Sequence, residues 1–109
     1  MPYDVIYREA APERADLDAG RGLQLLEFGA NGCGHCQAAQ AAIREVLEAL
    51  PDLSHRKVED GPGRRLGRSY RVKLWPTLIL LRDGQEVGRV VRPTTVEPLS
   101  ELLEAVTDN

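Results

Sequence analysis

Two cysteines, Cys33 and Cys36, are separated by two residues and are the only cysteines in the chain. Residues 23–28 before them are mostly apolar, and the residues after them carry apolar side chains at helical spacing, so both sulfurs are expected in the first turn of a helix. Unpaired N–H groups and the helix dipole stabilise a thiolate there, which is the nucleophilic form. We predict Gly32 as the N-cap, Cys33 as the attacking sulfur and Cys36 as the resolving thiol.

A zinc half-site and a structural disulfide are the alternatives for such a pair. Zinc takes about four ligands, and apart from His35 between the cysteines the sequence offers one more histidine, His55, and no second cysteine pair. A disulfide that closes so short a loop constrains the unfolded chain little. Redox chemistry is therefore favoured, and we expect no bound metal and no cofactor.

The order of strand, turn, Cys-x-x-Cys and helix in residues 23–50 resembles the active-site segment of the thioredoxin family. The Gly34-His35 pair between the cysteines is similar to that of protein disulfide isomerase domains, whereas ordinary thioredoxins have Gly-Pro. An imidazolium beside the thiolate stabilises the reduced form. We therefore predict a reduction potential between those of thioredoxin and disulfide isomerase, about −270 and −180 mV.

A second signature of the family resembles the segment Trp75-Pro76-Thr77, which precedes the apolar run 78–81. In the family a cis-proline here starts a strand that faces the cysteines. The resemblance implies that Pro76 presents the backbone of Trp75 to an extended substrate, with Thr77 beside it. Proline is also tolerated at the first residue of a strand without any function.

Glu27 is a charged residue within an expected central strand. Burying a carboxylate is costly unless it is paired or protonated. The resemblance implies that Glu27 takes the place of an acid, usually aspartate, that assists proton transfer to and from the resolving cysteine, with the raised pKa of a general base. It also places Lys57 near this acid. A glutamate at the strand edge and a solvated lysine remain the alternatives.

Three residues depart from the family pattern around the site. Gly32 stands where the family commonly has tryptophan, while Trp75 stands where a smaller residue is common. We expect both positions to shape an altered substrate groove. Arg92 lies in the loop after the last strand, where the family typically has glycine, and we expect it to approach Cys33 and stabilise its thiolate.

Length and composition predict one thioredoxin-like domain over residues 1–109, with a net charge of −3 that gives no footprint for nucleic acid. Apolar runs fall short of the roughly 20 residues of a membrane span, and acids near the N-terminus argue against a signal peptide, so we expect a cytoplasmic monomer. The expected class is α/β: a thioredoxin fold whose mixed sheet of four to five strands has helices on both faces. Expected strands are 4–7, 23–28, 53–59, 78–81 and 86–91; expected helices are 12–17, 33–50, 64–71 and 95–106.

These observations predict a thiol-disulfide oxidoreductase that reduces or exchanges protein disulfides through Cys33 and Cys36. A reductase or a small thiol must supply its electrons. Two alternatives remain: an oxidant or isomerase with a raised potential, and a redox-responsive binding module without turnover.

Overall fold

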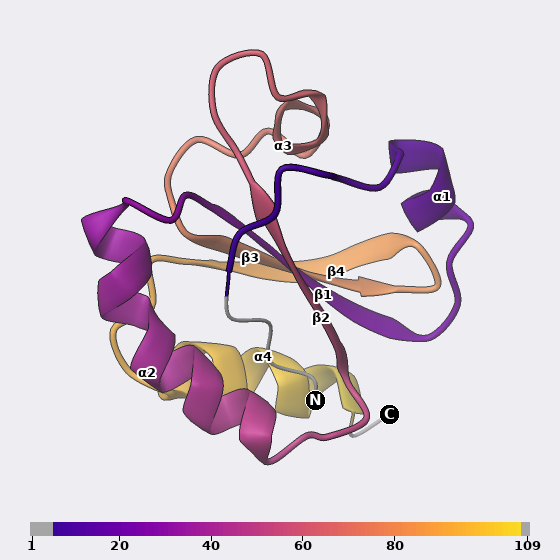
Figure 1. The fold of residues 1–109 in the computed structure, drawn as a ribbon. Coiled ribbons are helices and arrows are strands. Elements are labelled where there is room, and N and C mark those ends of the chain that lie inside the picture. The colour runs from indigo at the N-terminus through magenta and orange to yellow at the C-terminus, as the bar shows by residue number, and fades with distance from the viewer. Residues whose placement is uncertain (1–5, 108–109) are drawn as a thin grey trace.

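The computed structural model describes residues 6–107 and contains a sheet with helices on both faces (Figure 1). The strands are β1 (Leu23–Gly29), β2 (Ser54–Glu59), β3 (Thr77–Arg82) and β4 (Gln85–Val91), and the helices are α1 (Arg14–Asp18), α2 (Gly34–Glu48), α3 (Arg65–Ser69) and α4 (Glu97–Thr107).

The sheet is mixed and has the order β2-β1-β3-β4. β1 pairs parallel with β2 and antiparallel with β3, and β3 pairs antiparallel with β4. β1 and β3 are central strands with near-continuous burial, as expected for strands covered on both faces. The register places Glu27 opposite Lys57 on β2 and Leu78 on β3. The carboxyl end of β1 leads directly into the turn before the cysteines.

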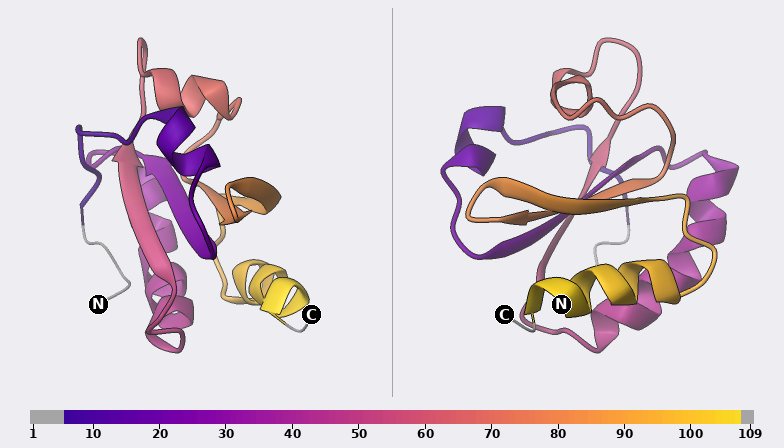
Figure 2. Two further views of the ribbon diagram at one scale, coloured as in Figure 1. Left: turned by 90° about the vertical axis from the view of Figure 1, so that its right-hand side faces the viewer. Right: turned by 180° about the vertical axis from the view of Figure 1, so that it is seen from behind.

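Two hydrophobic cores lie on opposite faces of the sheet. One core is formed with α2 and α4 and contains Leu25, Ile43, Leu47, Leu80 and Leu103 among others. The second core lies on the side of α1 and α3, which contribute Leu17 and Leu66. Figure 1 shows α2 and α4 together below the sheet and α1 and α3 above it, and the turned views of Figure 2 show the same separation. The predicted class and layering are confirmed.

Several element boundaries differ from expectation. The first expected strand, 4–7, lies partly outside the described residues; Ile6 and Tyr7 are not in a strand, and the segment instead joins β2 through a single bridge between Arg8 and Val58. Residues 6–107 therefore form a sheet of four strands. The expected helix 12–17 begins later, at Arg14, because Glu13 has an extended backbone (ψ 146°).

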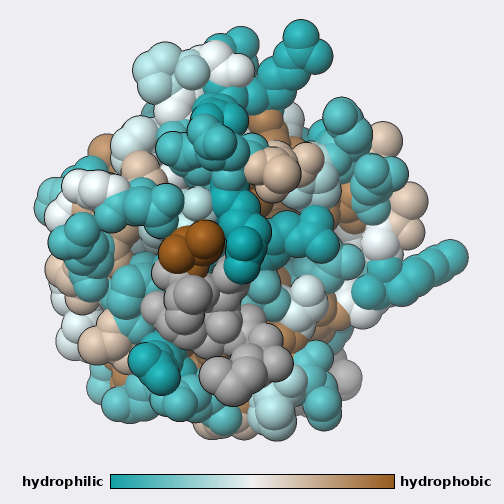
Figure 3. All heavy atoms as spheres, viewed as in Figure 1, coloured by the Kyte–Doolittle hydropathy of each residue, from teal (hydrophilic) through white to brown (hydrophobic). Residues whose placement is uncertain are grey.

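The surface is largely polar on the face shown in Figure 3, where hydrophilic residues predominate and hydrophobic ones occupy small separate areas. Large hydrophobic side chains that stay exposed include Leu74 and Val91. Both lie beside the cis-proline segment, because Leu74 precedes Trp75 and Val91 pairs with Thr77. Among the described residues, no helix is long and apolar enough to cross a membrane.

Candidate active site

Cys33 is the N-cap of α2, one residue later than expected. Its backbone is extended (φ −85°, ψ 121°), and its sulfur accepts the N–H of Cys36 at 3.2 Å. The prediction of Gly32 as N-cap is wrong, because the capping acceptor is the Cys33 sulfur and glycine has no side chain to supply one. A backbone donor and the helix dipole thus both favour negative charge on this sulfur.

Cys36 lies one turn further into α2 and is 1% exposed, whereas Cys33 is partly exposed. Both cysteines are free thiols in this structure. Burial and the hydrogen bond with Cys33 raise the pKa of Cys36 to about 11. The two sulfurs therefore differ as an attacking and a resolving thiol should. The sulfur of Cys33 is partly exposed and accepts a backbone hydrogen bond, whereas that of Cys36 is buried and protonated.

The Glu27 carboxylate lies fully buried beneath α2 and accepts three hydrogen bonds. The hydroxyl of Tyr7 donates to Oε2. Gln40 Nε2 on α2 donates to the same oxygen at 2.9 Å. His55 Nε2 on β2 lies 2.9 Å from Oε1. The alternative of a solvent-reaching glutamate is excluded, since Glu27 is 0% exposed.

The expectation that Glu27 has a raised pKa is wrong. Burial alone raises the pKa of this carboxyl, but the hydrogen bonds and charge of His55, with the bonds from Tyr7 and Gln40, hold it below the ordinary value. Hydrogen bonding to the charged form of an acid favours ionisation. Glu27 is therefore a buried carboxylate that stays ionised at neutral pH.

Lys57 is 2% exposed, which excludes the solvated lysine. Its ammonium donates to Gln40 Oε1 at 2.9 Å and lies 4.3 Å from the centre of the Tyr7 ring. Because Gln40 also donates to Glu27, its amide links the lysine to the carboxylate. Glu27 and Lys57 therefore both lie in one poorly solvated place and are joined through Gln40, while their role in proton transfer stays a prediction.

The Trp75–Pro76 peptide bond is cis and leads into β3. The indole N–H of Trp75 donates to Asp60 at 2.9 Å, which fixes the ring. Thr77 is buried, and its hydroxyl donates to the carbonyl of Leu74 at 2.6 Å.

In the part of the chain that the structure describes, Arg92 makes no hydrogen bond to Cys33 and is instead bonded to the cis-proline segment. Its guanidinium donates to the carbonyl of Trp75 at 2.9 Å, and its backbone N–H donates to the carbonyl of Pro76 at 2.9 Å. The observed partners of Arg92 are therefore Trp75 and Pro76, and its effect on the Cys33 thiolate stays a prediction. A φ of +51° turns the residue back toward the cis-proline segment.

The positive φ of Arg92 predicts which of two variants at this position is the more stable. Both Arg92→Gly and Arg92→Ala lose the bond to Trp75, but only glycine adopts positive φ without steric cost. We expect Arg92→Gly to be more stable than Arg92→Ala by about 1 kcal/mol in urea unfolding. Arg89 is the control, because it lies within strand β4. At that position the order should reverse, and Arg89→Ala should be more stable than Arg89→Gly. Equal stabilities of the two Arg92 variants would show that its backbone carries no strain.

Three residues of this site were missed by sequence reasoning. Gln40 could have been found, because it lies four residues after Cys36 and shares its helical face. His55 was weighed only as a metal ligand, although it stands two residues before Lys57 on the same face of β2. Tyr7 gave no signal, since nothing in the sequence brings its segment under the cysteines.

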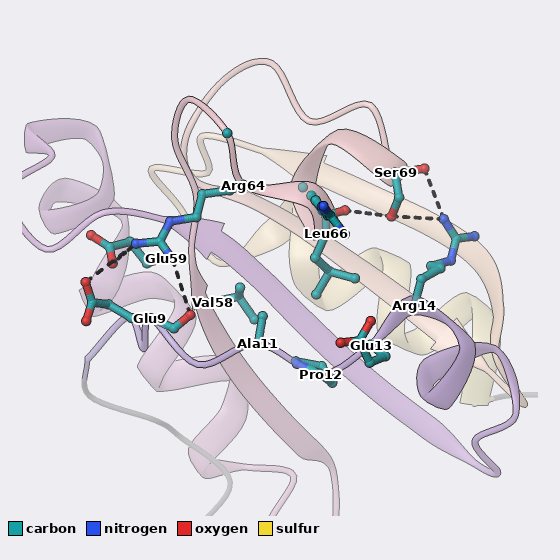
Figure 4. A pocket seen from close by; sticks show the side chains of 13 residues that line it. Glu9, Ala11, Pro12, Glu13, Arg14, Val58, Glu59, Arg64, Leu66 and Ser69 are labelled. Atoms are coloured by element: carbon teal, nitrogen blue, oxygen red, sulfur yellow. Dashed lines mark hydrogen bonds and ion pairs between the residues drawn. The ribbon is translucent and has the colours of Figure 1, made fainter.

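A cavity of about 430 Å³ lies elsewhere, between α1, α3 and residues 9–12 (Figure 4). Arg64 in its wall is paired with Glu59 at 3.1 Å, and Arg14 donates to the carbonyl of Ser69 at 3.0 Å. Neither cysteine lines it. The redox chemistry therefore belongs to the surface around Cys33 and not to this cavity.

Comparisons with known proteins agree with this geometry. The thioredoxin family model matches residues 10–105. The chain belongs to the thioredoxin family. It is 33% identical over 91 residues to thioredoxin of Chlamydia pneumoniae, covering 84% of this chain and 89% of that one. Against Thioredoxin H2-1 of Oryza sativa subsp. japonica it is 33% identical over 69 residues, which is 63% of this chain and only 50% of the relative's length.

The structure of thioredoxin 2 from Pseudomonas aeruginosa PAO1 in its reduced form superposes with a TM-score of 0.86 and 53% identity, covering 97% of this chain and 98% of that one. This thioredoxin-family protein is thus a thiol-disulfide oxidoreductase acting on protein disulfides, with a reductase as its partner. The comparisons do not favour the oxidant, isomerase or binding-module alternatives.

Proposed function

We propose that this protein reduces protein disulfides, with Cys33 as nucleophile and Cys36 as resolving thiol. The observation that carries the proposal is the position of the Cys33 sulfur at the start of α2, where it accepts the Cys36 N–H and remains partly exposed. Its thiolate attacks one sulfur of the substrate, and a mixed disulfide forms as the other sulfur leaves. Cys36 then attacks Cys33, releases the second substrate sulfur and closes the enzyme disulfide.

Glu27 and Lys57 manage the proton of Cys36 in this proposal. The pKa of Cys36 is raised to about 11, and that of Glu27 lies below its ordinary value of 4.5. In the resting dithiol the proton therefore stays on the sulfur of Cys36. Glu27 therefore accepts the proton only as the new S–S bond forms, and Lys57 holds the opposing charge nearby.

The substrate groove is formed by Gly32 on one side of Cys33 and by Trp75, Pro76 and Thr77 on the other. The backbone of Trp75 offers strand-like hydrogen bonds to an extended substrate. Arg92 takes part through the carbonyl of Trp75, to which its guanidinium donates. Exposed Leu74 and Val91 add apolar surface beside this segment.

The further parts of the proposal concern the whole protein. Residues 1–109 act as one domain, as a cytoplasmic monomer, without a cofactor and without binding nucleic acid or a membrane. Electrons come from a reductase, with small thiols as the second source. The mild net charge of −3 supports the exclusion of nucleic acid.

A redox titration tests the proposal. Equilibration of the Cys33–Cys36 couple in glutathione and dithiol buffers, followed by Trp75 fluorescence and thiol alkylation, should give a reversible two-electron potential between about −270 and −180 mV. His35 is exposed next to Gly34 in the first turn of α2, where proline is tolerated. We expect His35→Pro to lower the potential by about 30 mV or more.

Arg44→Ala on the outer face of the same helix is the matched control and should leave the potential unchanged. A couple that never closes a disulfide in any buffer would refute the redox function. A potential that His35→Pro leaves unchanged would refute only the role of His35.

A further inference from the structure

The Tyr7 hydroxyl lies between the resolving thiol and the buried carboxylate. It donates to Glu27 Oε2, and Gln40 Nε2 lies 3.3 Å from it as a second donor. The Tyr7 ring and the Cys36 sulfur lie close together over Gly29, and each of the two groups shifts the pKa of the other. Among the described residues, no hydrogen bond joins Glu27 to Cys36 directly. Tyr7 is therefore the group that connects them.

Packing holds the hydroxyl in this place. Tyr7 is 4% exposed. A Cβ placed on Gly29 would lie 2.6 Å from Tyr7 Cζ and 2.7 Å from Cys36 Sγ, so the ring and the sulfur meet over this glycine. The side chain of Asn31 fixes the Tyr7 backbone, with Oδ1 accepting its N–H at 2.9 Å and Nδ2 donating to its carbonyl at 3.1 Å. Any larger residue at position 29 would separate phenol and thiol.

We propose that Tyr7 is a catalytic residue that carries the proton between Cys36 and Glu27. This role rests on the proposed function and deepens it. In the resolving step the Cys36 S–H bond breaks and its sulfur bonds to Cys33 Sγ, while the bond from Cys33 to the substrate sulfur breaks and that sulfur leaves with the electron pair. The proton passes to Tyr7 Oη, and the proton of Tyr7 passes to Glu27 Oε2. The two enzyme cysteines are oxidised by two electrons, and the substrate disulfide is reduced.

The charges around the relay suit this direction of transfer. Glu27 is ionised at neutral pH, so an acceptor is always present. Burial and the adjacent carboxylate raise the pKa of Tyr7, so its proton is also present throughout the working range. The other titratable groups facing the relay are Cys33 on α2 and His55 and Lys57 on β2. Tyr7 stays protonated and Glu27 stays ionised across the working range. The rate at which Cys36 attacks Cys33 should therefore be independent of pH.

The experiment uses the full chain and 5,5′-dithiobis(2-nitrobenzoate) as a disulfide probe. Attack by Cys33 releases one coloured thiolate, and resolution by Cys36 releases the second, so stopped-flow absorbance separates the two steps. In the unmodified protein we expect the rate of the second phase to be constant between pH 7 and 9. In Tyr7→Phe this rate should be roughly 10- to 100-fold lower at pH 7 and should rise about tenfold per pH unit. The rate of the first phase should be unchanged.

Tyr70→Phe is the matched control. Tyr70 is equally buried, at 4%, but lies in the core on the other face of the sheet, and in the described part of the chain its hydroxyl has no hydrogen-bond partner. Both phases should be unchanged in that variant, so the effect of Tyr7→Phe cannot come from the loss of a buried hydroxyl alone.

The outcomes separate the two proposals. A first phase without a second in the unmodified protein would overturn the resolving role of Cys36 and with it the proposed function. A second phase with the same rate and pH slope in both proteins would overturn the role of Tyr7 alone. If Tyr7→Phe does not fold, the unmodified protein still decides, because a tenfold rise per pH unit in its second phase would exclude the relay.

Discussion

Replacing Cys36 by serine should stop turnover and leave the substrate attached to Cys33. Cys33 keeps its place as the N-cap of α2 and its partial exposure, so the first attack should proceed at close to its normal rate. A serine hydroxyl does not displace a thiolate from a disulfide, and release then depends on external thiols. Since well-placed intramolecular groups act at very high effective molarity, turnover at millimolar thiol should fall on the order of 10³-fold or more.

Mass spectrometry of the intact protein after mixing with a disulfide substrate measures this result. One adduct per chain should persist in Cys36→Ser and disappear on addition of dithiothreitol. The same substitution at the other sulfur, Cys33→Ser, is the control and should form no adduct. Full turnover by Cys36→Ser would show that Cys33 works alone with an external thiol, and the two-cysteine mechanism would be wrong.

Replacing Glu27 by glutamine should destabilise the protein by about 2 kcal/mol at pH 7 and slow the resolving step. The carboxylate accepts hydrogen bonds from Tyr7, Gln40 and His55, and charge makes such bonds stronger than neutral ones. A neutral amide also removes the negative charge that lies near the buried ammonium of Lys57. Attack by Cys33 should be unaffected, because its cap does not involve Glu27.

The pH dependence of this loss has a defined sign. The pKa of Glu27 is lower in the folded protein than in the unfolded chain. Its contribution is therefore fully present above the unfolded value and disappears as pH falls through the folded value. Urea unfolding should show a large difference between unmodified protein and Glu27→Gln at pH 7 and a smaller one near pH 3.5.

Glu59→Gln on the neighbouring strand is the matched control for this variant. Glu59 is partly exposed and pairs with Arg64 at 3.1 Å, and such pairs contribute roughly 0–1 kcal/mol. If Glu27→Gln costs no more than Glu59→Gln, the buried hydrogen bonds of Glu27 do not stabilise the fold, and the lowered pKa would also be wrong.

Much of the fold could be predicted from local sequence pattern. The apolar run of β1, the spacing of Ile43 and Leu47 on α2, and the Asp-Gly turn before Gln85 are signals within a few residues of one another. The side of the sheet that each helix covers follows from such patterns once the strand order is known. The two cysteines and Pro76 were found because they belong to short motifs.

The predictions that failed depend on contacts between distant segments. The pKa of Glu27 is set by residues 13, 20 and 28 positions away, namely Gln40, Tyr7 and His55, and burial alone gives the opposite direction. The orientation of Arg92 depends on a positive φ that no motif announced. Hydrogen-bond partners inside a core are selected by three-dimensional packing, so pattern and propensity do not specify them.

The two bonds between Asn31 and the backbone of Tyr7 also have a mechanical consequence. Asn31 belongs to the turn that leads into Cys33, whereas Tyr7 belongs to a segment that is tied to the sheet edge through Arg8. The turn before Cys33 and the segment of Tyr7 are therefore tied to each other. We expect any displacement of this turn during docking of a partner to displace Tyr7 as well.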